Sequence, residues 1–120
     1  MRDDEALAWG GLLRAFGHPT RLMILAELLK GTRCVNDMTE LLARPQPNVS
    51  QHLMALRESG LVDFYREGLS RCYYLASPDF IRGLFDLLEQ ETRRPSETGQ
   101  TAKRKREASQ KVESSGGPGL

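Results

Sequence analysis

The fold is decided by one stretch, QPNVSQHLMALRESGLV, at residues 46–62. It has the form of a short helix that ends at Gly60 and runs into an apolar strand. Val49, Leu53 and Leu56 recur at helical spacing, which predicts one buried stripe. The opposite side of that helix then carries Pro47, Asn48 and Gln51, with Ser50 and His52 at its margins.

The polar side of this helix has two interpretations. Amide, hydroxyl and imidazole groups can hydrogen-bond base edges and phosphates in a DNA major groove. An ordinary solvated face is the alternative, because polar helix faces are common. The preceding segment favours DNA: a short helix ends near Leu42, and Pro45 then pushes Arg44 out of helical geometry. Two short helices joined by about four residues fit a helix-turn-helix, whose second helix enters the groove.

The remaining chain supplies three more helices and a hairpin. Helices are expected over 4–16, 19–30 and 78–94, and Asp37 with Glu40 has capping-box spacing for the helix that starts at Asn36 or Asp37. Residues 61–66 and 70–75 read as strands around the turn Glu67-Gly68-Leu69. A lone hairpin is marginal in water, so an extended piece at 32–35 is the natural third strand. The fold class is mainly α with a small β-hairpin wing (α+β).

The first and last helices carry apolar stripes that a chain this small cannot easily cover. Such stripes favour a two-fold homodimer closed by these two helices. The alternative is that both helices fold back on their own domain, and a lone Trp on a terminal helix is usually core. The expected interface residues are Trp9, Leu13, Phe80, Ile81, Leu84, Phe85 and Leu88.

Composition bounds the class of protein. The 120 residues predict one domain at 1–94, and a net charge of only +1 means that any DNA contact must come from a local patch. Residues 95–120 are too polar to bury surface, so they are expected to form a disordered tail. Its cluster Lys103-Arg104-Lys105-Arg106 is more simply a solvated run than a phosphate contact. No apolar run is long enough to span a membrane, and no signal peptide is visible; two cysteines then indicate a reducing, cytoplasmic compartment.

Several segments resemble the ArsR/SmtB family of bacterial repressors. They are FGHPTRLMILAELLKG, RCVNDMTELL, PQPNVSQHLMALRESGLVDFYREG and SRCYYL, in that order along the chain. The resemblance covers roughly residues 5–92. It implies a winged helix-turn-helix homodimer that binds an imperfect inverted repeat in double-stranded operator DNA, blocks transcription, and lets go when an inducer binds.

The resemblance also implies which residues meet DNA. The family's reading positions fall on Gln46, Asn48, Ser50, Gln51 and His52, with Arg66 and Arg71 on the wing. This agrees with the interpretation from the residues alone. The helix offers amide and hydroxyl groups, and the wing offers guanidinium groups suited to phosphates or a narrow minor groove.

The inducer sites known in the family are incomplete here. The arsenic-type sensor has a Cys-x-Cys pair in CVCDL, where this chain has Cys34-Val35-Asn36-Asp37-Met38. The zinc-type sensor uses His and carboxylates of the last helix, but residues 77–94 contain no histidine. Since a soft metalloid needs several thiolates, neither route is expected, and no metal site or cofactor is assigned.

Cys34 and Cys72 are the remaining sensor candidates. In a winged-helix sheet the first strand lies beside the last wing strand, which would bring the two thiols within reach of each other. They could form a reversible disulfide or sulfur bridge if their Cα atoms approach to about 4.4–6.8 Å. They could also give a metalloid two thiolates, with a third ligand missing, or simply fill a buried sheet as small apolar side chains.

Two functions from other classes compete with the repressor. One is a winged-helix module that has lost DNA binding and meets a protein through its recognition face, or that lacks an inducer site. The retained Gln, Asn, Ser and Arg side chains favour DNA. The other is an enzyme, which is not expected because the sequence has no glycine-rich phosphate loop, nucleophile elbow or His-Glu metal motif.

Overall fold

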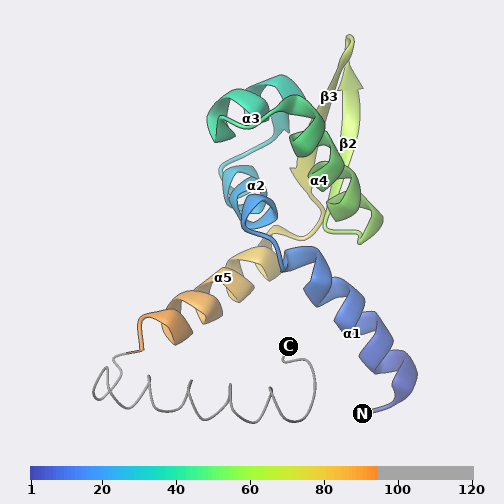
Figure 1. Cartoon of the computed structure of the whole chain (residues 1–120), viewed down its shortest axis with the longest axis vertical. Coiled ribbons are helices and arrows are strands. Elements are labelled where there is room, and N and C mark those ends of the chain that lie inside the picture. The colour runs from blue at the N-terminus through green and yellow to red at the C-terminus, as the bar shows by residue number, and fades with distance from the viewer. Residues whose placement is uncertain (95–120) are drawn as a thin grey trace. The chain divides into compact units, whose positions relative to one another are not determined.

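A computed structural model describes residues 1–94 of the chain (Figure 1). Its elements are α1 (Asp3–Phe16), α2 (Pro19–Leu29), β1 (Arg33–Cys34), α3 (Val35–Leu42), α4 (Gln46–Glu58), β2 (Val62–Glu67), β3 (Ser70–Leu75) and α5 (Pro78–Thr92). The chain divides into two compact units, one that ends at Leu84 and one that begins at Phe85. The interface candidates Phe85 and Leu88 belong to the second unit. The predicted tail at 95–120, with its basic cluster, lies outside the described residues.

The core of the first unit forms where α4 packs on α2, α3 and β2 (Figure 1). The predicted stripe is confirmed, because Val49, Leu53 and Leu56 have at most 1% of their surface exposed. Ile24 and Leu25 of α2 are fully buried beside them. The helix expected over 19–30 therefore contributes fully buried side chains to this core.

The helix-turn-helix differs from its prediction at the start of the first helix. α3 begins at Val35, directly after β1. The extended Cys34 occupies its N-cap position, and no side chain caps the helix. The predicted cap at Asn36 or Asp37 is therefore wrong: pairing of β1 with the sheet fixes where the chain turns into the helix. Met38 and Leu42 of α3 are buried, whereas Leu41 is 53% exposed. Ala43, in the left-handed conformation at φ 52°, follows the last residue of α3, and three residues, 43–45, connect α3 to α4.

The predicted third strand is confirmed. β1 pairs antiparallel with β3, which pairs antiparallel with β2, so the strand order is β1-β3-β2. Only two residues, Gly68 and Leu69, connect β2 to β3, and Gly68 adopts a φ of 62° that favours glycine. The register places Cys34 opposite Cys72 across the short first strand.

The two candidate dimer helices expose part of their apolar stripes. On α1, Trp9 is 55% and Leu13 61% exposed, while Phe16 is buried and meets the ring of Phe80 edge-on at 6.0 Å. Ile81, assigned above to the dimer interface, is fully buried within its own chain. That assignment is wrong, because a helical stripe does not tell which of its residues the same chain already covers.

Truncation of the α4 stripe should show how far the fold depends on it. We expect Leu53→Ala to lower the free energy of unfolding by about 2–5 kcal/mol, because it leaves a cavity in a closed core. Met54 is the matched control on the same helix, since its side chain is 54% exposed. Met54→Ala should change stability by less than about 0.5 kcal/mol in the same urea titration. Equal losses would contradict the packing described.

Candidate nucleic-acid interface

The first half of α4 presents polar side chains opposite its buried stripe. Gln46, Asn48 and Gln51 are exposed, and Ser50 is half-buried at the margin of this face. Val49 and Leu53 anchor the same two turns in the core. The helix therefore holds amide and hydroxyl groups outward on a rigid support, which suits direct reading of base edges.

Two arginines stand opposite each other at the tip of the wing. Arg66 of β2 and Arg71 of β3 are register partners, and both are exposed. The Arg71 guanidinium carbon also lies 4.8 Å from the centroid of the Phe64 ring. Like charges directly across an antiparallel pair are unfavourable, so a phosphate between or beside them would relieve the repulsion.

The helix α4 and the wing, which is the hairpin of β2 and β3, meet at a surface pocket of about 270 Å³. Gln46 and Ser50 of α4 line it, as do Leu69 and Arg71 of the wing. Asn36 of α3 lines it too, and sequence reasoning did not count this residue among the DNA contacts. Its amide next to predicted DNA contacts makes it a further candidate, which the chain order alone could not reveal.

The side chain of His52 contacts the side chains of His18 and Arg21. Its ring lies 4.2 Å from that of His18, and its Nδ1 accepts a hydrogen bond of 3.1 Å from Nε of Arg21. Burial, followed by the electrostatic influence of His18, Arg21 and Arg44, lowers the pKa of His52 below its usual value. Because Nδ1 is an acceptor, the neutral ring carries its proton on Nε2 and can donate it to DNA.

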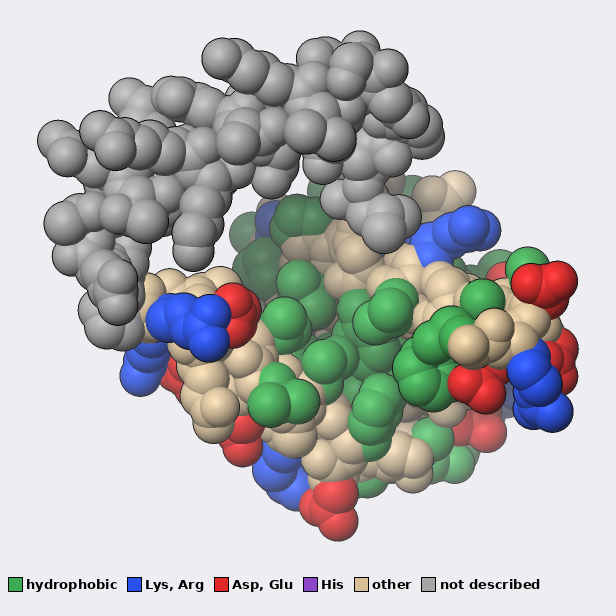
Figure 2. Space-filling view, turned by 90° about the horizontal axis from the view of Figure 1, so that it is seen from below, with side chains coloured by type: hydrophobic (Ala, Val, Ile, Leu, Met, Phe, Trp, Pro, Cys, Tyr) green, Lys and Arg blue, Asp and Glu red, His purple; other side chains and the backbone are tan. Residues whose placement is uncertain are grey.

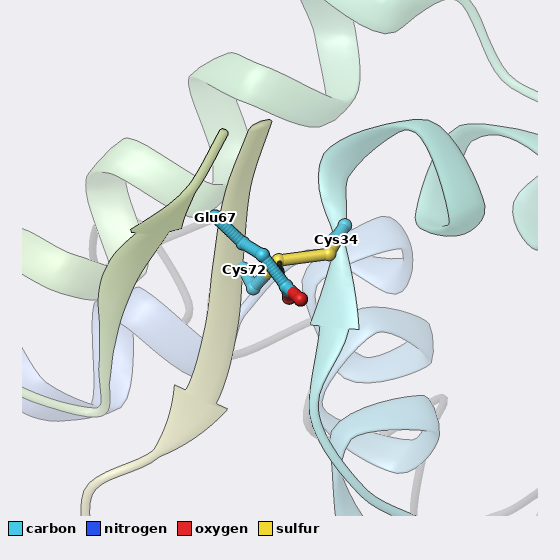
Figure 3. Close-up of side chains that lie close together, drawn as sticks. All are labelled: Cys34, Glu67 and Cys72. Atoms are coloured by element: carbon cyan, nitrogen blue, oxygen red, sulfur yellow. Dashed lines mark hydrogen bonds between the residues drawn. A yellow bond between two sulfur atoms is a disulfide. The ribbon is translucent and has the colours of Figure 1, made fainter. Parts of the chain in front are cut away.

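Cys34 and Cys72 form a disulfide across the β1–β3 register (Figure 3). The predicted proximity of the two thiols is confirmed, although their Cα atoms are 3.8 Å apart, closer than the predicted window. Oε2 of Glu67 lies 3.8 Å from Sγ of Cys72. A disulfide sulfur has no hydrogen to donate, so this is a contact and not a hydrogen bond. Glu67 was not among the sequence-based candidates.

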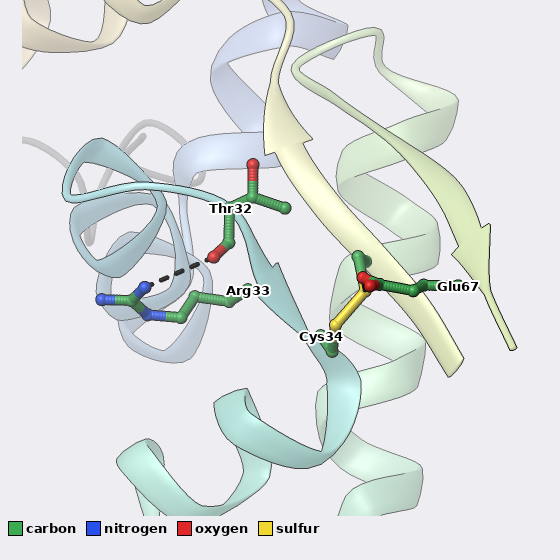
Figure 4. The surroundings of a disulfide bond; sticks show 5 residues. Thr32, Arg33, Cys34 and Glu67 are labelled. Atoms are coloured by element: carbon green, nitrogen blue, oxygen red, sulfur yellow. Dashed lines mark hydrogen bonds between the residues drawn. A yellow bond between two sulfur atoms is a disulfide. The ribbon is translucent and has the colours of Figure 1, made fainter. Parts of the chain in front are cut away.

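The first strand itself carries an arginine beside the disulfide (Figure 4). Nη1 of Arg33 donates to the backbone oxygen of Thr32 at 3.3 Å, while its Nε is buried without a partner. The guanidinium is thus turned back along its own strand. Figure 4 shows it pointing away from Cys34 and Glu67, so it does not neutralise the carboxylate there.

Comparison with known proteins agrees with this geometry. Residues 18–63 match the family model described as bacterial regulatory protein, arsR family. The chain is 38% identical over 80 residues to an uncharacterized HTH-type transcriptional regulator of Methanocaldococcus jannaschii, covering 66% of this chain and 89% of that protein.

Two further matches extend the comparison. The HTH-type transcriptional repressor SmtB of Mycobacterium tuberculosis is 44% identical over 69 residues, which is 58% of this chain but only 51% of the repressor. The homodimeric winged helix-turn-helix DNA-binding domain Mb0332 of Mycobacterium bovis superposes with a TM-score of 0.70 at 22% identity. The superposed region covers 82% of this chain and 96% of the Mb0332 chain, and this likeness supports the fold alone.

Among the helices of the described residues, none has the length and apolar character needed to cross a membrane.

Protonation of His52 should weaken the fold. The pKa of this imidazole is lowered in the folded chain, so the unfolded chain binds the extra proton more readily. Stability should therefore fall as pH drops below about 6.5, the ordinary pKa of histidine, and continue to fall until the folded-state pKa is passed. The thermal midpoint of wild type should drop more between neutral and mildly acidic pH than that of His52→Asn. Parallel pH profiles for the two proteins would count against a lowered pKa of His52 in the folded chain.

Proposed function

The chain belongs to the bacterial ArsR family of transcriptional regulators, and from this premise we propose that it is a repressor that binds an inverted-repeat operator as a homodimer. The observation that carries the proposal is the pocket where α4, α3 and the wing converge. It gathers Gln46, Ser50 and Arg71, which were predicted as DNA contacts from separate parts of the sequence. A surface with amide groups on a helix and a guanidinium on the wing suits a DNA groove, whose base edges are flanked by phosphates.

The two halves of this surface would have different tasks. Gln46, Asn48 and Gln51 would read base edges, because amides can pair bidentately with a base. Arg66 and Arg71 would hold the backbone or enter the minor groove, which fixes register with less regard for sequence. His52, fixed by Arg21, would contribute its Nε2–H at the edge of the reading helix.

Pairing of two copies would place two reading helices on one operator. α1 leaves Leu7, Trp9 and Leu13 between 55% and 78% exposed, and α5 leaves Phe80 45% exposed. Figure 2 shows exposed hydrophobic side chains among the polar ones in the view from below. Mb0332, which shares the fold, is homodimeric. A two-fold axis between two such copies would make the operator palindromic. We retain Leu84, Phe85 and Leu88 as interface candidates.

The disulfide would couple this repressor to a redox or sulfur signal. We place the protein in the cytoplasm, where thiols are normally reduced and a disulfide marks a transient state. Cys34 is the N-cap residue of α3, and Cys72 lies in β3 of the wing. A bond between them ties the first helix of the helix-turn-helix to the wing. Oxidation would then tilt the wing relative to α4 and lower DNA affinity.

Base-reading and phosphate-binding residues should respond differently to substitution. Arg66→Ala should weaken binding to specific and unrelated duplexes alike and reduce the slope of log affinity against log salt by about 1. Gln51→Ala should cost about 1–3 kcal/mol on the preferred sequence and little on unrelated DNA. Fluorescence anisotropy with a duplex from upstream of the protein's own gene would measure both.

Arg82 supplies the matched control, since it is an exposed arginine on α5 that pairs with Asp79. Arg82→Ala should leave DNA binding unchanged. A protein that ignores duplex DNA at low salt would instead be an interaction module that meets another protein through α4. A chain that stays monomeric in sedimentation at micromolar concentration would overturn the paired arrangement.

Thiol oxidation should release the DNA. Diamide removes two electrons and two protons from Cys34 and Cys72 and leaves the disulfide. We expect the oxidised full-length protein to bind its duplex at least about tenfold more weakly than the dithiothreitol-treated protein, which corresponds to a coupling of about 1.4 kcal/mol. Cys34→Ser and Cys72→Ser should each bind equally with and without oxidant. A parent-like response in either variant would end the disulfide hypothesis.

A further inference from the structure

Glu67 completes a third ligand position beside the two cysteines. We propose that the reduced pair, together with this carboxylate, forms a binding site for a thiophilic divalent cation, with Zn²⁺ as the reference ion. This inference rests on the proposed function in one respect, since it requires the same cysteine pair to be reducible. It is independent of DNA binding.

The strand register is what brings the carboxylate to the sulfurs. Tyr65 lies opposite Cys72, so Glu67, two residues further along β2, is the diagonal neighbour of Cys72 on the same face of the hairpin. Figure 3 shows the Glu67 side chain reaching from β2 across Cys72 towards the disulfide. One ligand atom from each of Cys34, Glu67 and Cys72 lies within 4.8 Å of the others.

These separations fit a tetrahedral ion. With Zn–S near 2.3 Å and Zn–O near 2.1 Å, tetrahedral angles set S···S at about 3.8 Å and S···O at about 3.6 Å. Oε2 of Glu67 is already 3.8 Å from Sγ of Cys72. Reduction breaks the S–S bond and moves the two sulfurs apart to van der Waals contact. That separation is about the S···S distance that a tetrahedral zinc ion requires.

Glu67 is also free to serve as a ligand. Within residues 1–94, ion pairs engage Asp63, Glu27 and Glu89, but none engages Glu67. Its side chain is exposed, whereas Cys72 is fully buried and Cys34 half-buried. An ion would therefore enter from the Glu67 side, and a water would complete the fourth position as in open zinc sites.

The donor set selects among ions. Two thiolates and one carboxylate suit a borderline-soft divalent cation, and arsenite, which needs several thiolates, would lack its third sulfur. The ion replaces one proton on each thiol, so binding releases two protons and leaves a net charge of −1 on the site. Disulfide and ion are mutually exclusive, because the bridged sulfurs have no thiolate to offer. Bound Zn²⁺ would thus protect the pair from oxidation.

The test is zinc binding by the reduced, full-length protein under anaerobic conditions, measured by competition with a chromophoric chelator. Reduced wild type should bind one Zn²⁺ per chain, and diamide-oxidised protein none. Glu67→Gln keeps both cysteines and the side-chain size, and should bind at least about tenfold more weakly, since even substitutions beyond the ligands cost that much. Glu58→Gln, an exposed carboxylate of α4 outside the site, should bind like wild type.

A second readout follows the thiols themselves. Stoichiometric Zn²⁺ should slow diamide oxidation of wild type and have much less effect on Glu67→Gln. Undiminished zinc affinity in Glu67→Gln, or no binding by reduced wild type, would overturn the site. If DNA binding and its redox response persist in that case, the proposed function stands and only the cation site fails. If the protein binds zinc but not DNA, the cation site stands and the proposed function fails.

Discussion

The antiparallel pairing of β1 with β3 is the constraint on which the rest of the structure depends. Two residues, Arg33 and Cys34, add an edge strand to the hairpin and lead directly into α3. A two-stranded hairpin would be marginal without such support. The pairing therefore stabilises the wing and at the same time fixes the distance between the wing and the first helix of the helix-turn-helix.

Both proposed activities use this junction. The pocket that gathers Asn36, Ser50 and Arg71 lies where α3 and α4 approach the wing, and Asn36 follows closely after β1 in the chain. The same register sets Cys34 opposite Cys72 and leaves Glu67 on the diagonal. A change in bonding at the cysteines would act on the strand that positions Arg71, one residue away along β3. Chemistry at the thiols and geometry at the proposed DNA surface would thus share one strand.

His52 shows a second form of control over the reading helix. Arg21 and His18 of the α2 region hold its ring from the side of the core, and burial keeps its pKa low. A residue that the sequence offers simply as a DNA contact is therefore also part of the packing between α2 and α4. Under the proposed function, substitution there would change both stability and DNA affinity, and the two effects would have to be measured separately.

The sequence by itself determined the order of helices and strands, the buried stripe of α4, the polar face opposite it and the proximity of the two cysteines. The first three follow from periodicity and from proline and glycine positions, which act locally along the chain. The proximity of the cysteines follows instead from the sheet of the expected winged-helix fold. Only the tertiary structure decided that Ile81 is covered by its own chain, that Cys34 and not Asn36 or Asp37 precedes α3, and that Glu67 reaches the cysteines. Each of these depends on which segments far apart in sequence pack or pair, and local patterns carry no information about that register.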